Sequence, residues 1–171
     1  MIFSFKKHDT VLYNTLLSLS RNLFFYDKVK LNDSFETRII LMFLHFSILM
    51  FIFKKKGKKF DQKSYDSLFH NIENNLRELG FGDVSVNKKM KDLNKILYDI
   101  LLKINSSDSD SKFSVNSKII IKYFNQKDQR NQLKYEDIES YFNDFFNFCF
   151  ELSLDNMIQD LKKYKFNNGC T

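Results

Sequence analysis

The side chains that most often carry chemistry are few and scattered in this chain. Its three histidines are His8, His45 and His70, and none has a second metal ligand three or four residues away on an obvious shared helix face. Its two cysteines, Cys149 and Cys170, have no nearby histidine that could activate a thiolate. The sequence therefore predicts neither a metal site nor catalytic residues.

Two further patterns do not support a catalytic or nucleotide-binding role. Gly80-Phe81-Gly82 lacks the third glycine of a dinucleotide-binding turn and does not follow a strand. Asp108 and Asp110 lie in a polar stretch that could not hold a general acid in position. His45, inside an apolar segment, is interpreted as a hydrogen-bonded core histidine. We predict a protein that is not an enzyme and that uses no cofactor or small-molecule substrate.

The charge of the chain favours anionic partners. The formal net charge is +6 and the isoelectric point is about 9.1, and lysines gather at Lys54–Lys59 and at 88–91. Such runs suit RNA, a ribosome or a membrane surface, and they also suit an ordinary solvated face. Most aromatic side chains fall on inward helical stripes, which disfavours single-strand nucleic-acid binding by base stacking.

The composition predicts long helices. The 171 residues include no proline and only four glycines, whereas sheet-rich folds draw on both for their turns. Hydrophobic residues make up 43% and charged residues 28%, which is typical of a globular chain, and the length suits a single domain. We predict an all-α, single compact multi-helix domain around a central apolar helix at about residues 34–53.

The central helix has a recognisable start. Asp33 is the expected N-cap, because Glu36 follows it at capping-box spacing. The apolar run Ile39–Phe53 spans roughly 22 Å at ~1.5 Å per residue, short of the ~30 Å hydrocarbon core of a bilayer. A helix covered by other helices is therefore favoured. A membrane span and an interfacial helix are the alternatives.

Apolar periodicity predicts the remaining helices. They are expected at Thr10–Phe25, Asp61–Leu79, Val86–Ile104, Phe113–Phe124, Tyr135–Leu154 and Leu154–Tyr164. Leu79 is assigned to the inward stripe of its helix. The segment Phe113–Phe124 leaves helix and strand open, and a helix fits the rest of the chain better. A polar loop is expected at 105–112 and a frayed end at the last residues.

The stretch Leu76–Lys91 joins two of these helices. Gly80 suits the left-handed position that ends a helix, Gly82 adds a second permissive position, and Asp83 or Ser85 can cap the next helix. The sequence then places Lys88, Lys89 and Lys91 in the first turns of that helix, where cations oppose the helix dipole. This placement indicates either a basic patch that attracts an anionic or carbonyl-rich partner or a wet, lysine-rich surface.

Four stretches of the chain resemble one protein family. The most specific is Leu76–Lys91, where the family has Leu-Arg-Glu, one further residue, Gly, an apolar residue, Gly-Asp and then a basic helix start. The other three are Tyr13–Tyr26 with its Ser20-Arg21 and Phe25-Tyr26 steps, Asp33–Arg38 followed by Leu44-His45, and Tyr65–Phe69. On these residues, Tyr13 to about Lys103 resembles the ubiquinol–cytochrome c chaperone family, the assembly factors for cytochrome b of respiratory complex III. The sequence departs from the family where Asp99 follows Tyr98 in place of Gly-Arg, and beyond Ser106 the likeness is only that of a helical chain.

The resemblance implies a non-enzymatic chaperone with a family-like core at about 10–104 and a helical C-terminal part at 113–166. Its implied client is newly made cytochrome b, and mitochondrial members act with a small partner protein near the ribosome exit. The positions that match the family's motifs are the predicted binding surface: Arg77, Glu78, Gly80, Gly82, Asp83, Lys88 and Lys91, supported by Arg38 and His45. Structural roles compete with this interpretation for Arg77 and Glu78, which could fix the turn, and are favoured for the glycines. The alternative function is a basic peripheral membrane- or RNA-binding module.

Three features bear on localisation. A single pair of cysteines is no disulfide framework, which favours a reducing compartment. The start of the chain, MIFSFKKHDT, has no secretory-signal pattern and is short for a mitochondrial presequence. We expect a bacterial cytoplasm, at the inner face of the membrane, or a mitochondrial matrix if the protein is eukaryotic.

Overall fold

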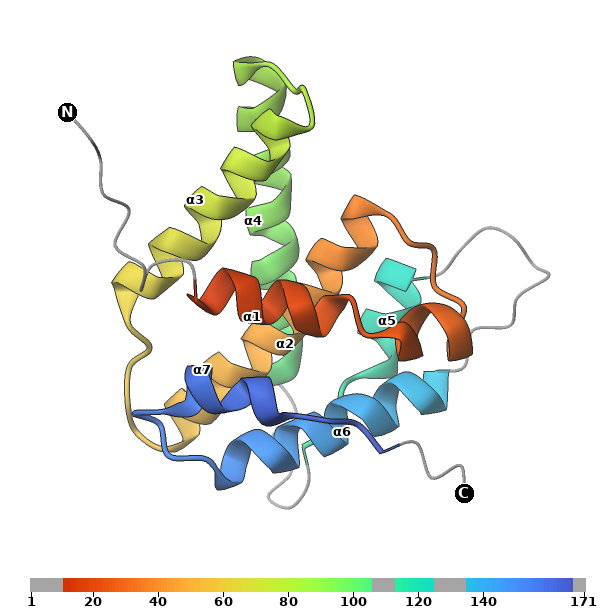
Figure 1. Ribbon diagram of the computed structural model, residues 1–171, viewed down its shortest axis with the longest axis vertical. Helices are drawn as coiled ribbons and strands as arrows, with labels where there is room; N and C mark the ends of the chain where they lie inside the picture. Colours follow the sequence, from red (N-terminus) through yellow and green to blue (C-terminus); the bar gives the residue numbers. More distant parts are fainter. Residues whose placement is uncertain (1–10, 106–112, 125–134, 168–171) are drawn as a thin grey trace.

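The computed structural model describes residues 11–105, 113–124 and 135–167 (Figure 1). These residues form helices and no strands, which confirms the all-α prediction. In chain order they are α1 (Val11–Ser20), a π-helix (Phe24–Lys28), α2 (Phe35–Lys55), α3 (Gln62–Glu78), α4 (Asp83–Asn105), α5 (Ser117–Phe124), α6 (Tyr135–Glu151), α7 (Met157–Asp160) and a 3-10 turn (Leu161–Lys163). His8, Cys170 and most of the expected polar loop, including Asp108 and Asp110, lie outside the described residues.

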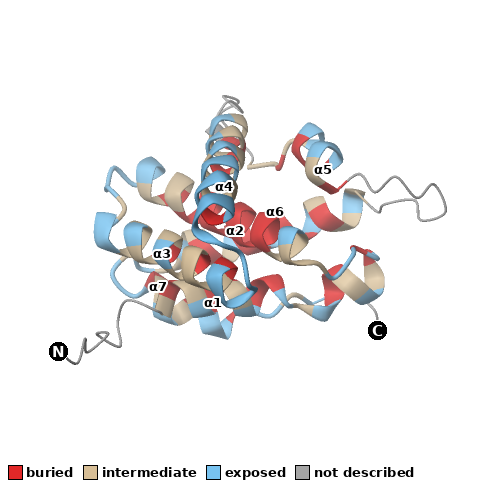
Figure 2. Cartoon of the chain, turned by 90° about the horizontal axis from the view of Figure 1, so that it is seen from above, coloured by how far each residue is buried: buried red, intermediate tan, exposed pale blue. Residues whose placement is uncertain are grey.

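Helix α2 runs through the centre of the molecule. Every residue from Ile39 to Leu49 is buried, and α1, α4 and α6 pack against it. Figure 2 shows the buried residues concentrated in α2 and on the sides of the helices that face it. By length and composition alone α2 could cross a membrane, with a mean hydropathy of 1.8, but 72% of its most apolar window is buried inside the protein. The interpretation as a central core helix is confirmed.

His45 is the ionisable side chain at the middle of α2, and it is fully buried. Its Nδ1 lies 2.7 Å from the carbonyl oxygen of Leu41, and its Nε2 lies 2.9 Å from the hydroxyl of Tyr141 on α6. Because a carbonyl oxygen can only accept, Nδ1 carries the proton and Nε2 accepts from the tyrosine. Burial lowers the pKa of His45 to about 4. The core-histidine interpretation is confirmed, and His45 is not part of any surface.

The start of α2 differs from the prediction by one residue. Ser34 is the N-cap, and its Oγ accepts from the backbone N–H of Thr37 at 3.1 Å. The prediction that Asp33 caps this helix is wrong, because the carboxylate of Asp33 pairs with Arg38, whose Nε lies 2.8 Å away. Because of this ion pair, the guanidinium of Arg38 is held beside the helix start and is not free at the surface.

The N-terminal and C-terminal helices are shorter than periodicity predicted. Helix α1 ends at Ser20, and the chain then turns through the π-helix rather than continuing to Phe25. Helix α6 ends at Glu151, and the expected continuation is broken before the single turn of α7. The inward stripe of α6 is buried as predicted: Ile138, Tyr141, Phe142, Phe145, Phe146 and Cys149. Burial raises the pKa of the Cys149 thiol, so it is an inert core residue.

The segment Phe113–Phe124, for which the sequence allows helix or strand, contains the helix α5. Asn116 caps it, with Oδ1 accepting from the N–H of Lys118 at 2.9 Å. Asp99 on α4 fixes α5 in place: it accepts from Lys122 at 2.8 Å and from the hydroxyl of Tyr123. These bonds keep the pKa of Asp99 well below its usual range. Asp99 therefore joins two helices.

The buried state of His45 predicts a pH-dependent stability. The unfolded chain takes up the imidazole proton near pH 6.5, whereas the folded chain does so only near pH 4. Lowering the pH through this window therefore favours the unfolded state. We expect the free energy of unfolding to fall by on the order of 3 kcal/mol between these limits. Urea titrations at a series of pH values measure this loss.

Two variants isolate the contribution of His45. In the His45→Gln variant, the free energy of unfolding should fall much less as the pH is lowered from 6.5 to 4. The variant should also be less stable at neutral pH. The exposed His70 offers a matched control, because His70→Gln should keep the slope of the unchanged protein. An identical slope in all three proteins would contradict the assignment.

Candidate functional site

Helices α3 and α4 form an antiparallel hairpin whose turn stands away from the rest of the protein (Figure 1). Near the body, Leu68 and Ile72 of α3 and Leu97 of α4 join the main core. Toward the turn, Leu76 and Val86 are fully buried but do not belong to that core. The two helices therefore close their far end with a small apolar contact of their own, and the turn is presented to solvent.

The turn is built on a Schellman motif, as the sequence predicted for Gly80. The N–H of Gly80 bonds to the carbonyl of Arg77 at 2.9 Å, and that of Phe81 to the carbonyl of Leu76 at 3.3 Å. Gly80 has a φ of 93°, a conformation that L side chains adopt at a cost. The turn's geometry therefore depends on this glycine.

The second glycine and the expected caps have different roles from those predicted. Helix α4 begins at Asp83 rather than Val86, and the carbonyl of Gly82 accepts its first helical bond from Val86 at 2.9 Å. Gly82 is thus the N-cap, and its φ is not in the left-handed region. Asp83 and Ser85 lie inside the first turn and do not cap it. The prediction failed because it missed the helical turn that precedes the periodic apolar residues.

Arg77 ties the end of α3 to the start of α4. Its guanidinium donates to the carboxylate of Asp83 across the turn and to Glu73 one turn back, the latter at 2.9 Å. These carboxylates raise the pKa of Arg77. All three groups are substantially exposed, so the ion pairs contribute little stability but define the shape of the turn. Arg77 thus fixes the turn, which is the structural role that the sequence allows for it.

The lysines lie farther along α4 than predicted. Because the helix starts three residues earlier, Lys88, Lys89 and Lys91 fall in its second and third turns, and Asp83 occupies the first. Their opposition to the helix dipole is correspondingly weaker than expected, since that effect fades beyond the first turn. Lys89 lies over the ring of Phe81, 4.6 Å from its centroid. Lys88 and Lys91 are exposed.

Three apolar residues at the turn were missed. Leu79, Phe81 and Val84 have 54%, 38% and 85% of their surface exposed. The predicted inward stripe of α3 includes Leu79, but the helix ends at Glu78 and the chain turns away. The available signal was the composition of the turn itself, where large apolar residues occupy positions that usually hold polar ones. Exposed apolar side chains gathered at one turn are a candidate interaction surface.

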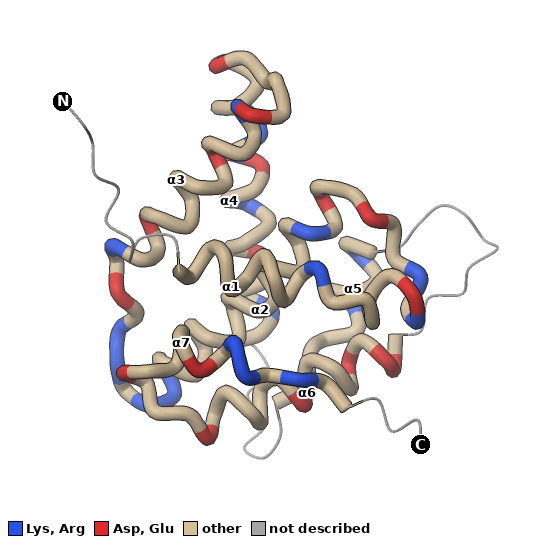
Figure 3. The backbone as a smooth tube through the Cα atoms, viewed as in Figure 1, with Lys and Arg blue, Asp and Glu red and all other residues tan. Residues whose placement is uncertain are grey.

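The structure brings together seven of the nine predicted site residues. Arg77, Glu78, Gly80, Gly82, Asp83, Lys88 and Lys91 all lie at or near the turn, which we call the hairpin tip (residues 77–91). Arg38 lies at the start of α2 and His45 in the core, so neither belongs to the tip. Figure 3 shows charges of both signs along the hairpin. Among the described residues, no group of three or more His, Cys, Asp or Glu could hold a metal ion.

Comparison with known proteins identifies the family. The family model described as Ubiquinol-cytochrome C chaperone matches residues 27–159, more than three quarters of the chain. The chain belongs to the ubiquinol–cytochrome c chaperone family. No curated protein and no solved structure gives a significant match. A chaperone family implies a non-enzymatic role and a protein client.

The matched residues differ from the stretch that carries the resemblance, Tyr13 to about Lys103. They begin at Asp27, so α1 and the Ser20-Arg21 step lie outside them, and they extend through α5 and α6 into α7. The C-terminal helices thus belong to the family architecture, whereas the sequence suggested only a shared helical character. The hairpin tip lies entirely within the match.

The backbone conformations of Gly80 and Gly82 predict that a Gly→Ser substitution changes the stability of the protein in opposite directions at the two positions. A Cβ would meet nothing within 4 Å at either position, so the backbone angle decides the outcome. Gly80→Ser should destabilise the protein by about 1–2 kcal/mol, because a side chain is strained at this positive φ. Gly82→Ser should be neutral or slightly stabilising, because serine is a better N-cap than glycine. Denaturant unfolding measures both, and equal losses would contradict these roles.

Proposed function

We propose that this protein is an assembly chaperone that binds newly made cytochrome b and supports biogenesis of the ubiquinol–cytochrome c reductase complex, complex III. The observation that carries the proposal is the family match over residues 27–159. The binding surface is the hairpin tip. Its apolar residues and lysines are accessible without any rearrangement of the core.

The chemistry of the tip suits a membrane-protein client that has not yet been assembled. Such a client exposes apolar segments and unpaired backbone carbonyls before its partners cover them. Leu79, Phe81 and Val84 offer apolar contact, while Lys88 and Lys91 offer ammonium donors to carbonyls or acidic side chains. Arg77 and Gly80 act as positioning residues, since they fix the turn that presents these groups.

A nucleic-acid-binding function fits the described surface less well. About 13 residues of α4 separate Lys88 from Leu101, which lies beside the Lys54–Lys59 run, so the two lysine runs are roughly 20 Å apart. This exceeds the ~8 Å screening length at physiological ionic strength. The fields of the two runs therefore overlap little, and nucleic-acid binding would leave the exposed apolar side chains of the tip without a role.

The proposal extends to location and partners. The protein acts in a bacterial cytoplasm at the inner face of the membrane, or in the mitochondrial matrix of a eukaryote. A small partner protein and the ribosome exit region are proposed as further contacts, by analogy with what the family resemblance implies.

Recovery of the client tests the role of the tip. A tagged chain should recover cytochrome b from cells that make complex III. Leu79→Ser/Val84→Ser should lower recovery roughly tenfold or more, because burying an exposed Leu or Val side chain against a client contributes about 1.5–3 kcal/mol. Lys88→Glu/Lys91→Glu should lower it as well. The matched control is Leu102→Ser/Ile121→Ser, which removes two exposed apolar side chains away from the tip and should leave recovery unchanged.

Deletion of the gene tests the function itself. Complex III should be depleted while other respiratory complexes are spared. An unchanged amount of complex III would refute the assembly role. Equal recovery of cytochrome b by the tip and control variants would remove the tip from the mechanism while leaving the family assignment intact.

A further inference from the structure

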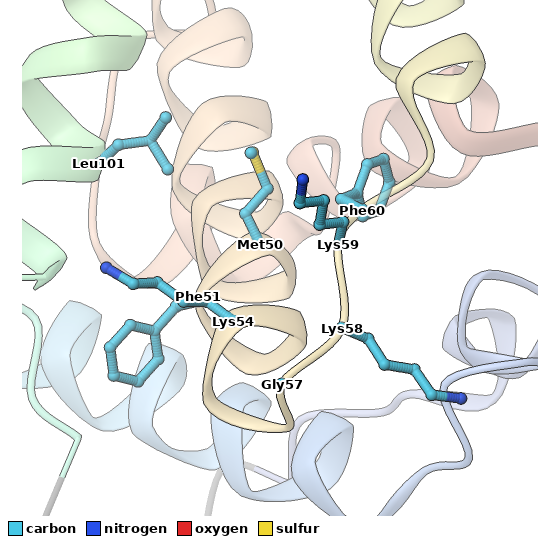
Figure 4. Close-up of a pocket in the computed structure, with 8 residues that line it drawn as sticks. All are labelled: Met50, Phe51, Lys54, Gly57, Lys58, Lys59, Phe60 and Leu101. Carbon is cyan, nitrogen blue, oxygen red and sulfur yellow. The ribbon is translucent and has the colours of Figure 1, made fainter.

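A pocket with no assigned role lies at the opposite end of the hairpin from the tip, beside the end of α2 (Figure 4). Its volume is about 420 Å³, within the ~300–1,000 Å³ typical of small-ligand sites. It is lined by Met50, Phe51, Lys54, Gly57, Lys58, Lys59, Phe60 and Leu101. We call it the α2 groove.

The walls of the α2 groove are apolar and held by the core. Phe60 packs edge-on against Phe46 and Phe53, with ring centroids 5.2 Å and 5.1 Å away. Met50 and Leu101 are half-buried and pack against the main core. The walls therefore keep their shape without a ligand.

The mouth of the groove is cationic. Five of the six residues at 54–59 are lysines, and three of them have contacts: Lys56 donates to the carbonyl of Phe150 at 2.7 Å, Lys55 lies over Phe51, and Lys58 lies 3.9 Å from Asp155. Lys54 and Lys59 have no partner among the described residues. Figure 4 shows Lys59 beside Met50, and Lys54 extending from α2 on the side of Leu101.

These lysines are not needed to cap the helix. A Schellman motif already closes α2: the N–H of Gly57 bonds to the carbonyl of Lys54 at 3.0 Å, and that of Lys58 to the carbonyl of Phe53 at 2.9 Å. The end of a helix is itself electronegative and would repel an anion. Any anion held here must therefore be held by the lysine side chains.

We propose that the α2 groove binds one anionic phospholipid of a membrane surface. An acyl chain lies against Met50, Phe60 and Leu101, and the anionic head at the mouth is attracted by Lys54 on one side of Met50 and by Lys59 on the other. Apolar walls with ammonium groups at the mouth match an amphiphile with an anionic head. A nucleic acid or a free phosphate would use the lysines but leave the apolar walls uncovered. This site is independent of the proposed cytochrome b surface, since about 20 Å of α4 separates them.

Vesicle flotation with the purified full chain tests the proposal. The protein should float with mixed phosphatidylglycerol–phosphatidylcholine vesicles and not with pure phosphatidylcholine. Lys54→Gln/Lys59→Gln should bind about 25-fold more weakly, since each lysine near an anionic surface strengthens binding about fivefold. The matched control, Lys162→Gln/Lys165→Gln, removes the same charge from two exposed lysines that belong to neither the groove nor the hairpin tip, and it should bind as the unchanged protein does.

A soluble probe tests the apolar half of the site. Short-chain phosphatidylglycerol, below its micelle concentration, should bind saturably, and glycerol phosphate should bind much more weakly. Equal weakening by the two lysine pairs, equal binding of the two probes, or no flotation of the unchanged protein would each overturn the proposal. The groove variant should still recover cytochrome b from a detergent extract, so failure here leaves the proposed function standing.

Discussion

Helix α2 is apolar on every side, and the fold depends on covering it. An ordinary surface helix buries one stripe, but every residue from Ile39 to Leu49 is hidden. Each such Leu, Ile or Phe contributes about 1.5–3 kcal/mol when removed from water, so three helices must contact α2 from different directions. The ionisable group inside this run, His45, is tolerated because Leu41 and Tyr141 satisfy both ring nitrogens. The hydrogen bond that the neutral imidazole accepts from Tyr141 links the centre of α2 to α6.

The α3–α4 hairpin is anchored by this core but not completed by it. Its inner half packs with the core, while its outer half is closed by Leu76 and Val86 and by the Arg77 ion pairs. Residues beyond that closure do not belong to the core. Exposed apolar side chains at Leu79 and Val84 are consequently not explained by stability, which is why their burial is expected in a complex with a client.

Cationic groups beside accessible apolar surface occur at both ends of this hairpin. At the tip, Lys89 lies over Phe81; at the α2 groove, Lys54 and Lys59 border Met50 and Phe60. Because the separation exceeds the screening length, each end can meet its own partner. A chaperone for a membrane-protein subunit that uses one end for the client and the other for a lipid surface would hold the client beside the bilayer.

The sequence alone determined the helical class, the central position of α2, the left-handed glycine at Gly80 and the membership of the family. The first three follow from local composition, periodicity and spacing, which need no knowledge of the partners in space, whereas the family follows from the likeness of its motifs and from the match over residues 27–159. The sequence misplaced the N-cap of α2, because Asp33 pairs with Arg38 and leaves Ser34 to cap the helix. It also misplaced the start of α4 and the direction of Leu79, because apolar periodicity does not mark the residue at which a helix begins or ends. Only the tertiary structure decided that Tyr141 is the partner of His45, that the hairpin tip stands free and that Leu101 meets the end of α2. Those outcomes require contacts between residues far apart in the chain, and no periodicity along one segment encodes them.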